Sequence, residues 1–207
     1  MPSLSVLSVF VPTFFLVSLT PGMCMTLAMV LGMTQGVKRA LWMMFGELFG
    51  VGLVAFAAGA GVAALMLKQP ALFELFKWAG GAYLLYLGVM MWRSRGRMAI
   101  PEEVVDTAPA SRRELALQGF VTAVANPKGW AFFVALLPPF IDAGRPVVSQ
   151  LLGLIAIILT LEFCCLLLYA TGGKSLRHLL GKGGNVRLLN RIAGTLMIGV
   201  GVWLALG

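Results

Sequence analysis

The chain has 207 residues, of which 59% are hydrophobic and only 12% are charged, whereas a soluble domain carries about 25% charged residues. Its apolar residues occur in long runs, which excludes an ordinary soluble domain and is typical of a helical membrane protein. The net charge of +8 does not indicate nucleic-acid binding, because the basic residues flank apolar runs and show no nucleic-acid motif or interleaving with aromatic residues.

Six apolar stretches approach or exceed the roughly 20 residues that a helix needs to cross a bilayer. They cover approximately residues 4–31, 40–67, 71–92, 115–138, 147–171 and 187–206. The sequence therefore predicts an all-α integral membrane protein with six transmembrane helices. Because no residue before Lys38 is charged, the first stretch lacks the basic segment of a signal peptide and is expected to be retained.

The first apolar stretch is interrupted by Thr20-Pro21-Gly22-Met23. Proline lacks an N–H and clashes with the preceding turn, while glycine lets the backbone turn freely. We expect a broken helix whose free carbonyls and exposed N-terminus hold the two charged groups of a zwitterion. A simple kink is the alternative, and a re-entrant first segment would leave five full spans.

The fourth stretch carries a second break, at Asn126-Pro127-Lys128-Gly129. Interrupted helices at corresponding places of two halves indicate a transport site near the membrane midplane. Lys128 is the only charge between Glu114 and Asp142, so it could bind a substrate carboxylate, pair with a glutamate or snorkel to the interface. The predicted substrate-binding residues are Thr20, Pro21, Gly22, Asn126, Pro127 and Lys128.

Two lone glutamates, Glu47 and Glu162, lie inside the second and fifth stretches. A carboxylate at the centre of a membrane helix costs on the order of 2.5–3.5 kcal/mol on insertion scales. We expect the two glutamates to couple transport to protons or to bind a substrate ammonium. A protonated carboxyl that hydrogen-bonds between helices is the structural alternative.

The segment 93–114 mixes both charge signs with Pro101 and Pro109 and is the only evident linker. It divides a single transporter domain, 1–207, into a repeat of about 1–92, a cytoplasmic linker and a repeat of about 115–207. An odd number of spans in each half predicts inverted repeats, with helices 1 and 4 broken. The order of break, glutamate and basic-x-Ala-Gly recurs, the last at Lys77-Trp78-Ala79-Gly80 and Arg191-Ile192-Ala193-Gly194.

Most lysines and arginines fall in the regions that follow the first, third and fifth stretches. Basic loops stay in the cytoplasm, so the sequence predicts that both termini lie outside.

The three cysteines, Cys24, Cys164 and Cys165, lie inside apolar runs, and an odd number there does not form a disulfide framework. A rival function is a membrane thiol–disulfide electron conduit that uses Cys24 against Cys164 or Cys165. The second half has no cysteine at the matching place after Pro127, which counts against this function. A passive pore, an assembly subunit and an importer also stay open, and we expect no metal and no cofactor.

Several of these motifs together resemble the LysE/RhtB family of bacterial amino-acid exporters over nearly the whole chain. They are Thr20-Pro21-Gly22, Gly46-Glu47, the run from Lys77 to Gly88, and Asn126-Pro127-Lys128. Met23 occupies a position where the family often has a second proline, which leaves the substrate open.

The resemblance implies an exporter of amino acids or their derivatives in the bacterial cytoplasmic (inner) membrane, coupled to protons. It points to the two breaks as the paired site, around which we expect alternating access. The expected partners are a small amino acid, protons and the lipid bilayer, with no nucleic acid. The sequence does not show the oligomeric state.

Overall fold

The computed structural model describes residues 4–94, 110–142, 144–181 and 183–206, and within these ranges it contains helices and no strand. The helices are α1 (Leu4–Leu19), α2 (Met23–Thr34), α3 (Val37–Lys68), α4 (Pro70–Arg93), α5 (Arg112–Val124), α6 (Pro127–Leu136), the 3-10 turn η1 (Pro138–Phe140), α7 (Val147–Gly181) and α8 (Gly183–Leu206). Most of the predicted linker, 95–109, lies outside the described residues.

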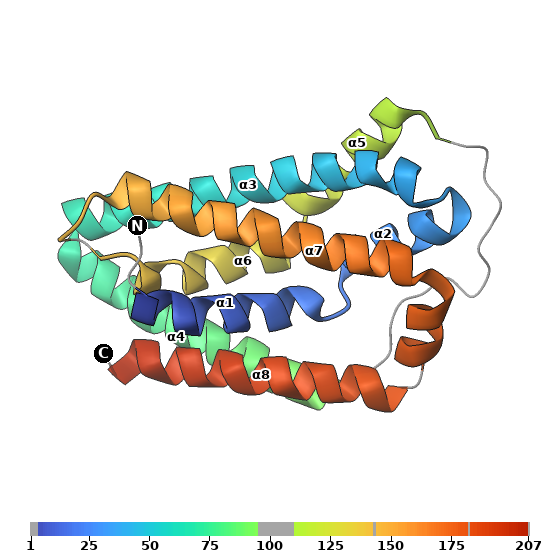
Figure 1. The fold of residues 1–207 in the computed structure, drawn as a ribbon. Coiled ribbons are helices and arrows are strands. Elements are labelled where there is room, and N and C mark those ends of the chain that lie inside the picture. Colours follow the sequence, from blue (N-terminus) through green and yellow to red (C-terminus); the bar gives the residue numbers. More distant parts are fainter. Residues whose placement is uncertain (1–3, 95–109, 143, 182, 207) are drawn as a thin grey trace.

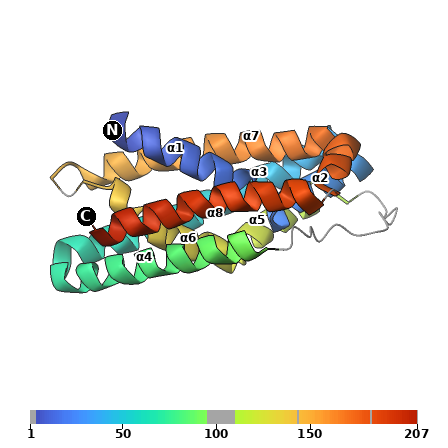
Figure 2. The ribbon, with the colours of Figure 1, turned by 90° about the horizontal axis from the view of Figure 1, so that it is seen from below.

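The helices run side by side along one common direction (Figures 1 and 2). Both chain ends and the turn from α3 to α4 lie at one end of this bundle, on the left of Figure 1, which we call the terminal end. The turn from α2 to α3, the start of α5 and the turn from α7 to α8 lie at the opposite end, which we call the linker end.

Both predicted breaks are breaks in the structure. Helix α1 ends at Leu19, and α2 begins at Met23 with a bend of 57° between them. Helix α5 ends at Val124, and α6 begins at Pro127. Proline at the start of α6 has no N–H to leave unpaired and already has a helical φ, so it favours a new helix at this position.

The described helices are apolar and long enough for a membrane protein, although the predicted six spans are not all evident as single helices. Val37–Leu65 and Val147–Gly173 are each long and apolar enough to cross a membrane, and the bent pair α1–α2 makes a third span if it counts as one. Helices α4 and α8, with 24 residues each, are about 36 Å long. The count of six spans therefore stays a prediction.

Glycines allow the closest helix contacts. A Cβ built on Gly46 of α3 would lie 1.8 Å from the carbonyl oxygen of Ala116 of α5, and one on Gly119 of α5 would lie 2.0 Å from that of Met43. Helices α2 and α7 meet in the same way where Gly32 faces Ala170. Such contacts bring backbones together, as small residues do in membrane bundles.

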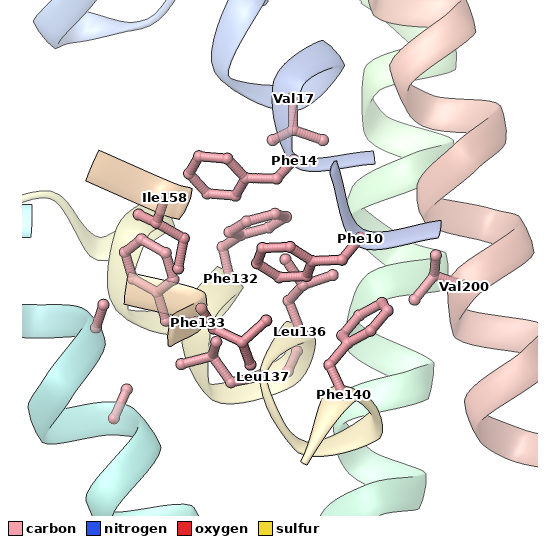
Figure 3. Packing of buried hydrophobic residues seen from close by; sticks show 14 of the residues in the cluster. Phe10, Phe14, Val17, Phe132, Phe133, Leu136, Leu137, Phe140, Ile158 and Val200 are labelled. Carbon is pink, nitrogen blue, oxygen red and sulfur yellow. The ribbon is translucent and has the colours of Figure 1, made fainter. Parts of the chain in front are cut away.

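An aromatic cluster packs α1 against α6 and η1 on the side of the bundle toward the terminal end, and Figure 3 shows its side chains from close by. Phe10 and Phe14 of α1 stack at a centroid distance of 5.9 Å, and Phe10 meets Phe140 edge-on at 5.0 Å. Phe14 also contacts Phe132 and Phe133 of α6, at 6.0 and 6.2 Å. This cluster joins the first broken helix to the second.

Polar contacts fix the start of α5 at the linker end. The guanidinium of Arg39 donates a hydrogen bond to the carbonyl of Ala110, and Arg112 lies 5.4 Å from the ring centroid of Trp42. Ser111 and Glu114 form a capping box, in which each side chain accepts from the backbone N–H of the other residue. These contacts hold α5 against α3 just where the described chain resumes.

Candidate functional site

A cavity of about 370 Å³ lies in the middle of the bundle, between the two helix breaks. Its volume is at the small end of the range for ligand pockets, about 300–1,000 Å³, and suits a small solute. Its described lining comes from α1, α2, α3, α5, α6, α7 and the breaks: Phe14, Val17, Ser18, Thr20, Pro21, Gly22, Met23, Cys24, Met25, Glu47, Val51, Val54, Ala123, Asn126, Gly129, Phe132, Phe133 and Glu162.

The first break contributes a helix N-terminus to the cavity. Gly22 is the N-cap of α2, with extended backbone and no side-chain hydrogen bond to the first turn. The first amide groups of a helix have no partner within it and carry a partial positive charge. Since Gly22, Met23 and Cys24 line the cavity, this end of α2 can receive an anionic group.

The carbonyls before the first break are less free than the sequence suggested. The hydroxyl and the N–H of Thr20 both donate to the carbonyl of Val17, at 2.5 and 3.2 Å. The hydroxyl of Tyr169 on α7 donates to the carbonyl of Leu19 at 2.8 Å. Thr20 therefore closes the last turn of α1, and Tyr169 ties this turn to α7.

The second break reaches the cavity through Asn126 and Gly129. The carbonyl of Asn126 accepts from the N–H groups of Gly129 and Trp130, at 3.1 and 3.4 Å, and so begins α6. Pro127 and Lys128 form the first turn of this helix. Their side chains lie outside the described part of the structure, so their predicted roles in binding stay predictions.

Glu47 of α3 is fully enclosed, with 0% of its surface exposed. Neither of its carboxyl oxygens has a hydrogen-bond partner within the described residues. Burying an ionised carboxylate without a partner is costly. Because Glu47 lines the cavity, a proton or a cationic group of a bound solute is the partner that this geometry can accept.

Glu162 of α7 faces the same cavity in different surroundings. The hydroxyl of Ser18 on α1 donates to Oε2 of Glu162 at 2.6 Å. The carboxyl groups of Glu47 and Glu162 lie close enough to interact electrostatically. The structure thus brings together two glutamates that are 115 positions apart in the sequence.

The cysteines form no bond with one another. All three are free thiols; Cys24 and Cys165 are buried, and Cys164 is exposed. Cys24 lines the cavity, and neither Cys164 nor Cys165 is among the described lining residues. Nothing in this arrangement supports the thiol–disulfide conduit. The described residues also contain no group of three or more His, Cys, Asp or Glu side chains suited to a metal.

The lining residues that sequence reasoning missed include Ser18, Phe14, Phe132 and Phe133. Ser18 had a usable signal, because it is a polar side chain in an apolar stretch just before the break. The phenylalanines had no such signal, because the sequence does not distinguish a phenylalanine that lines a cavity from one in ordinary apolar packing. Their role depends on which helices face each other, and this is a property of the tertiary structure.

Comparison with known proteins gives consistent matches. The family model described as LysE type translocator matches residues 15–207. The chain is 30% identical to the homoserine/homoserine lactone efflux protein of Salmonella typhimurium over 193 residues, which cover 93% of this chain and 92% of that protein.

It is also 32% identical to the leucine efflux protein of Salmonella choleraesuis over 177 residues, or 83% of this chain and 81% of that protein. An uncharacterized membrane protein of Vibrio cholerae is 28% identical over 188 residues, or 91% of this chain and 90% of that protein. No solved structure matches the chain significantly.

Proposed function

Because this chain belongs to the family of LysE type translocators, we propose that it is a transmembrane exporter of amino acids or their derivatives and that the central cavity binds the substrate. The observation that carries the proposal is a small cavity between two helix breaks that also contains two carboxyl groups. Relatives described as efflux proteins for homoserine and its lactone and for leucine support the substrate class.

In this proposal the two ends of an amino acid find complementary groups. The substrate ammonium lies against the carboxyl groups of Glu47 and Glu162, and the substrate carboxylate lies at the N-terminus of α2, beside Gly22. Asn126, which lines the cavity from the second break, makes a further contact with the substrate in this proposal. The enclosure of Glu47 and the uncapped first turn of α2 support this orientation.

Proton coupling is the second part of the proposal. Glu47 has no hydrogen-bond partner among the described residues, whereas Glu162 accepts from Ser18. A carboxyl group without a partner favours its neutral form until a cation arrives. We propose that Glu47 takes up a proton when the substrate leaves and releases it when a substrate ammonium binds, so that export is exchanged for protons.

Alternating access between two inverted three-helix repeats is the third part. The same order occurs twice: a broken helix, a long helix and a third helix, as α1–α2, α3, α4 and as α5–α6, α7, α8. Helix α3 packs against α5 and α6, α7 packs against α2 and α1, and α4 packs against α8. This exchange of partners between the halves supports a two-fold relation around the cavity.

The orientation of the chain in the membrane is inferred from the distribution of its basic residues. The linker end carries Lys38 and Arg39 at the start of α3 and Arg112 and Arg113 at the start of α5. We propose that this end is cytoplasmic in the bacterial inner membrane and that both termini lie outside.

The decisive experiment measures efflux of preloaded, labelled amino acids from cells with and without the chain, each with and without a proton uncoupler. The variants are Glu47→Gln, Glu162→Gln and the double variant, and the control is Glu74→Gln, an exposed glutamate on α4. We expect uncoupler-sensitive efflux that falls at least about tenfold in the double variant and stays unchanged in the control.

Two results would count against parts of this proposal. If proton-driven efflux is the same in the double variant as in the unaltered chain, the glutamates do not couple it. If no amino acid in the panel leaves faster when the chain is present, the exporter function itself is lost.

A further inference from the structure

The cavity has an apolar wall that the proposed ammonium and carboxylate contacts do not use. Phe14 of α1 and Phe132 and Phe133 of α6 line it, and we call these three residues the aromatic wall. Their exposed fractions are 2%, 4% and 5%, so the rings are held in place by their neighbours. Figure 3 shows the three rings gathered between α1 and α6.

In three of the lining helices, α1, α3 and α6, apolar lining residues lie on the same side of the polar ones, whereas Met23 and Met25 line the cavity from α2. Val51 and Val54 follow Glu47 on one face of α3, about 6 and 10 Å further along its axis. Phe14 precedes Ser18 by one turn of α1, and Phe132 and Phe133 follow Gly129 by about one turn of α6.

In all three helices, the apolar lining residues lie toward the same end of the bundle. Helix α1 starts at the terminal end of the bundle, and α3 and α6 finish toward it. The cavity is therefore polar at the level of the breaks and apolar on its side toward the terminal end.

The aromatic wall has a defined shape. The rings of Phe14 and Phe133 are nearly parallel, with an interplanar angle of 21°, and Phe132 meets Phe133 edge-on with centroids 5.8 Å apart. Packed rings of this kind do not rearrange freely, because protein interiors are close-packed. The wall can therefore discriminate between substrate side chains by size as well as by polarity.

We propose that the aromatic wall is the side-chain pocket of the transporter, and that its substrates are amino acids whose side chain is uncharged and ends in an apolar group. This inference rests on the proposed function and narrows it. Because Val51 lies one turn beyond Glu47 on the same face of α3, a substrate side chain that extends from an amino group at Glu47 toward the terminal end meets Val51 and the aromatic wall.

A second charge on the substrate would be buried against this wall. Removing an ionised group from water without a hydrogen-bonding partner is costly. The attraction of an ammonium to ring faces offsets only part of that cost. Dibasic and acidic amino acids are therefore excluded by their side chains, although they carry the same α-amino and α-carboxyl groups.

The test compares two amino acids that differ only at the tip of the side chain. The purified chain in liposomes is given labelled norleucine or lysine, which are nearly isosteric except for the terminal ammonium of lysine. Phenylalanine is the third solute and reports the size of the pocket. Uptake of each solute is measured in liposomes with a preset proton gradient that drives exchange of the solute for protons. Each solute is also added to the protein in detergent, and the thermal stabilisation of the protein is measured.

The variants are Phe132→Ala and Phe133→Ala, which enlarge the pocket. Phe132→Leu and Phe133→Leu keep the wall apolar and serve if an alanine variant does not fold. The matched control is Phe56→Ala, since Phe56 lies on α3 with 47% of its surface exposed and is not among the described lining residues.

For the unaltered chain we expect norleucine to be transported at least about tenfold faster than lysine. Either alanine variant should raise the ratio of phenylalanine to norleucine transport about tenfold, and Phe56→Ala should leave it unchanged. The leucine variants should keep the preference for norleucine over lysine. Like the alanine variants, they should raise the ratio of phenylalanine to norleucine transport.

Equal transport of lysine and norleucine would overturn the inference and leave the exporter function standing. The inference would also be overturned if the ratio of phenylalanine to norleucine transport were the same in Phe132→Ala, Phe133→Ala and the unaltered chain. Failure of all three solutes to be transported or to stabilise the protein, while other amino acids are exported, would also overturn it. Failure of every amino acid would remove the proposed function itself.

Discussion

Three glutamates of this chain have three different surroundings. Glu47 is enclosed without a described hydrogen-bond partner, and Glu162 accepts from Ser18 inside the cavity. Glu114 lies on the surface in the capping box of α5. One residue type can therefore serve as a site for a proton, a ligand for a cation or the cap of a helix, because neighbouring groups decide which form of the carboxyl is favoured.

Glu114 leads to a prediction about pH. The backbone N–H and the side chain of Ser111 hydrogen-bond to it and lower its pKa below the usual value. A lowered pKa in the folded state means that the cap stabilises α5 above the ordinary glutamate pKa, and that this contribution is lost as the pH falls through the lowered value.

Hydrogen exchange at the first turn of α5 measures this effect. After correction for intrinsic rates, we expect protection of the amides after Ser111 to decrease on acidification. Glu114→Gln, which does not ionise, should remove the pH dependence. The same decrease in that variant would show that another group is responsible.

At the scale of the element, the helices are held by contacts that only glycine permits. Gly46 and Gly119 bring α3 and α5 into backbone contact next to Glu47, and Gly88 and Gly194 do the same for α4 and α8. Gly61 on the same helix has no such role, since a Cβ there would meet nothing within 4 Å. The position of a glycine on the helix face, and not its presence, decides its contribution.

We therefore expect Gly46→Ala to destabilise the bundle. The added methyl group would lie 1.8 Å from the carbonyl oxygen of Ala116, so α3 and α5 must separate, at a cost of about 1–3 kcal/mol. Gly61→Ala is the matched control on the same helix. Thermal unfolding in detergent should show a lower midpoint for the first variant only; equal midpoints would mean that this contact does not hold the helices together.

The broken helices could be placed from the sequence because the chemistry of proline and glycine is local. Thr20-Pro21-Gly22 and Asn126-Pro127 end one helix and begin the next where the pattern indicates. The contact between Ser18 and Glu162 and the aromatic wall could not be placed in this way. Each joins residues more than 100 positions apart, so it depends on the packing of helices that no local pattern encodes.

At the scale of the whole molecule, the bundle separates two groups of helices. None of the described cavity residues comes from α4 or α8, which pack closely against each other through Gly88, Gly194 and Gly201. The remaining helices surround the cavity. In the alternating access proposed above, α4 and α8 stay fixed as a tightly packed pair while the helices around the substrate change their arrangement.

The position of both termini at one end of the bundle gives a prediction about topology. A reporter that is active only outside the cytoplasm, such as alkaline phosphatase, should be active when it is fused after Gly207. A reporter that fluoresces only in the cytoplasm should be bright when it is inserted between Arg95 and Pro109. The opposite pattern would reverse the proposed orientation, and different results for the N- and C-terminal ends would contradict an even number of spans.

The aromatic cluster between the cavity and the terminal end also has an electrical consequence. A bacterial membrane stores energy as a voltage, which is worth about 2.3 kcal/mol per elementary charge at 100 mV. A continuous path of water through a carrier would let ions leak and dissipate this voltage. Phe10, Phe14 and Phe140 interlock across this part of the bundle, so a hydrated ion finds hydrocarbon there instead of water. In the proposed exporter, this cluster would therefore block a continuous path of water in the present conformation and prevent the ion leak that would dissipate the voltage.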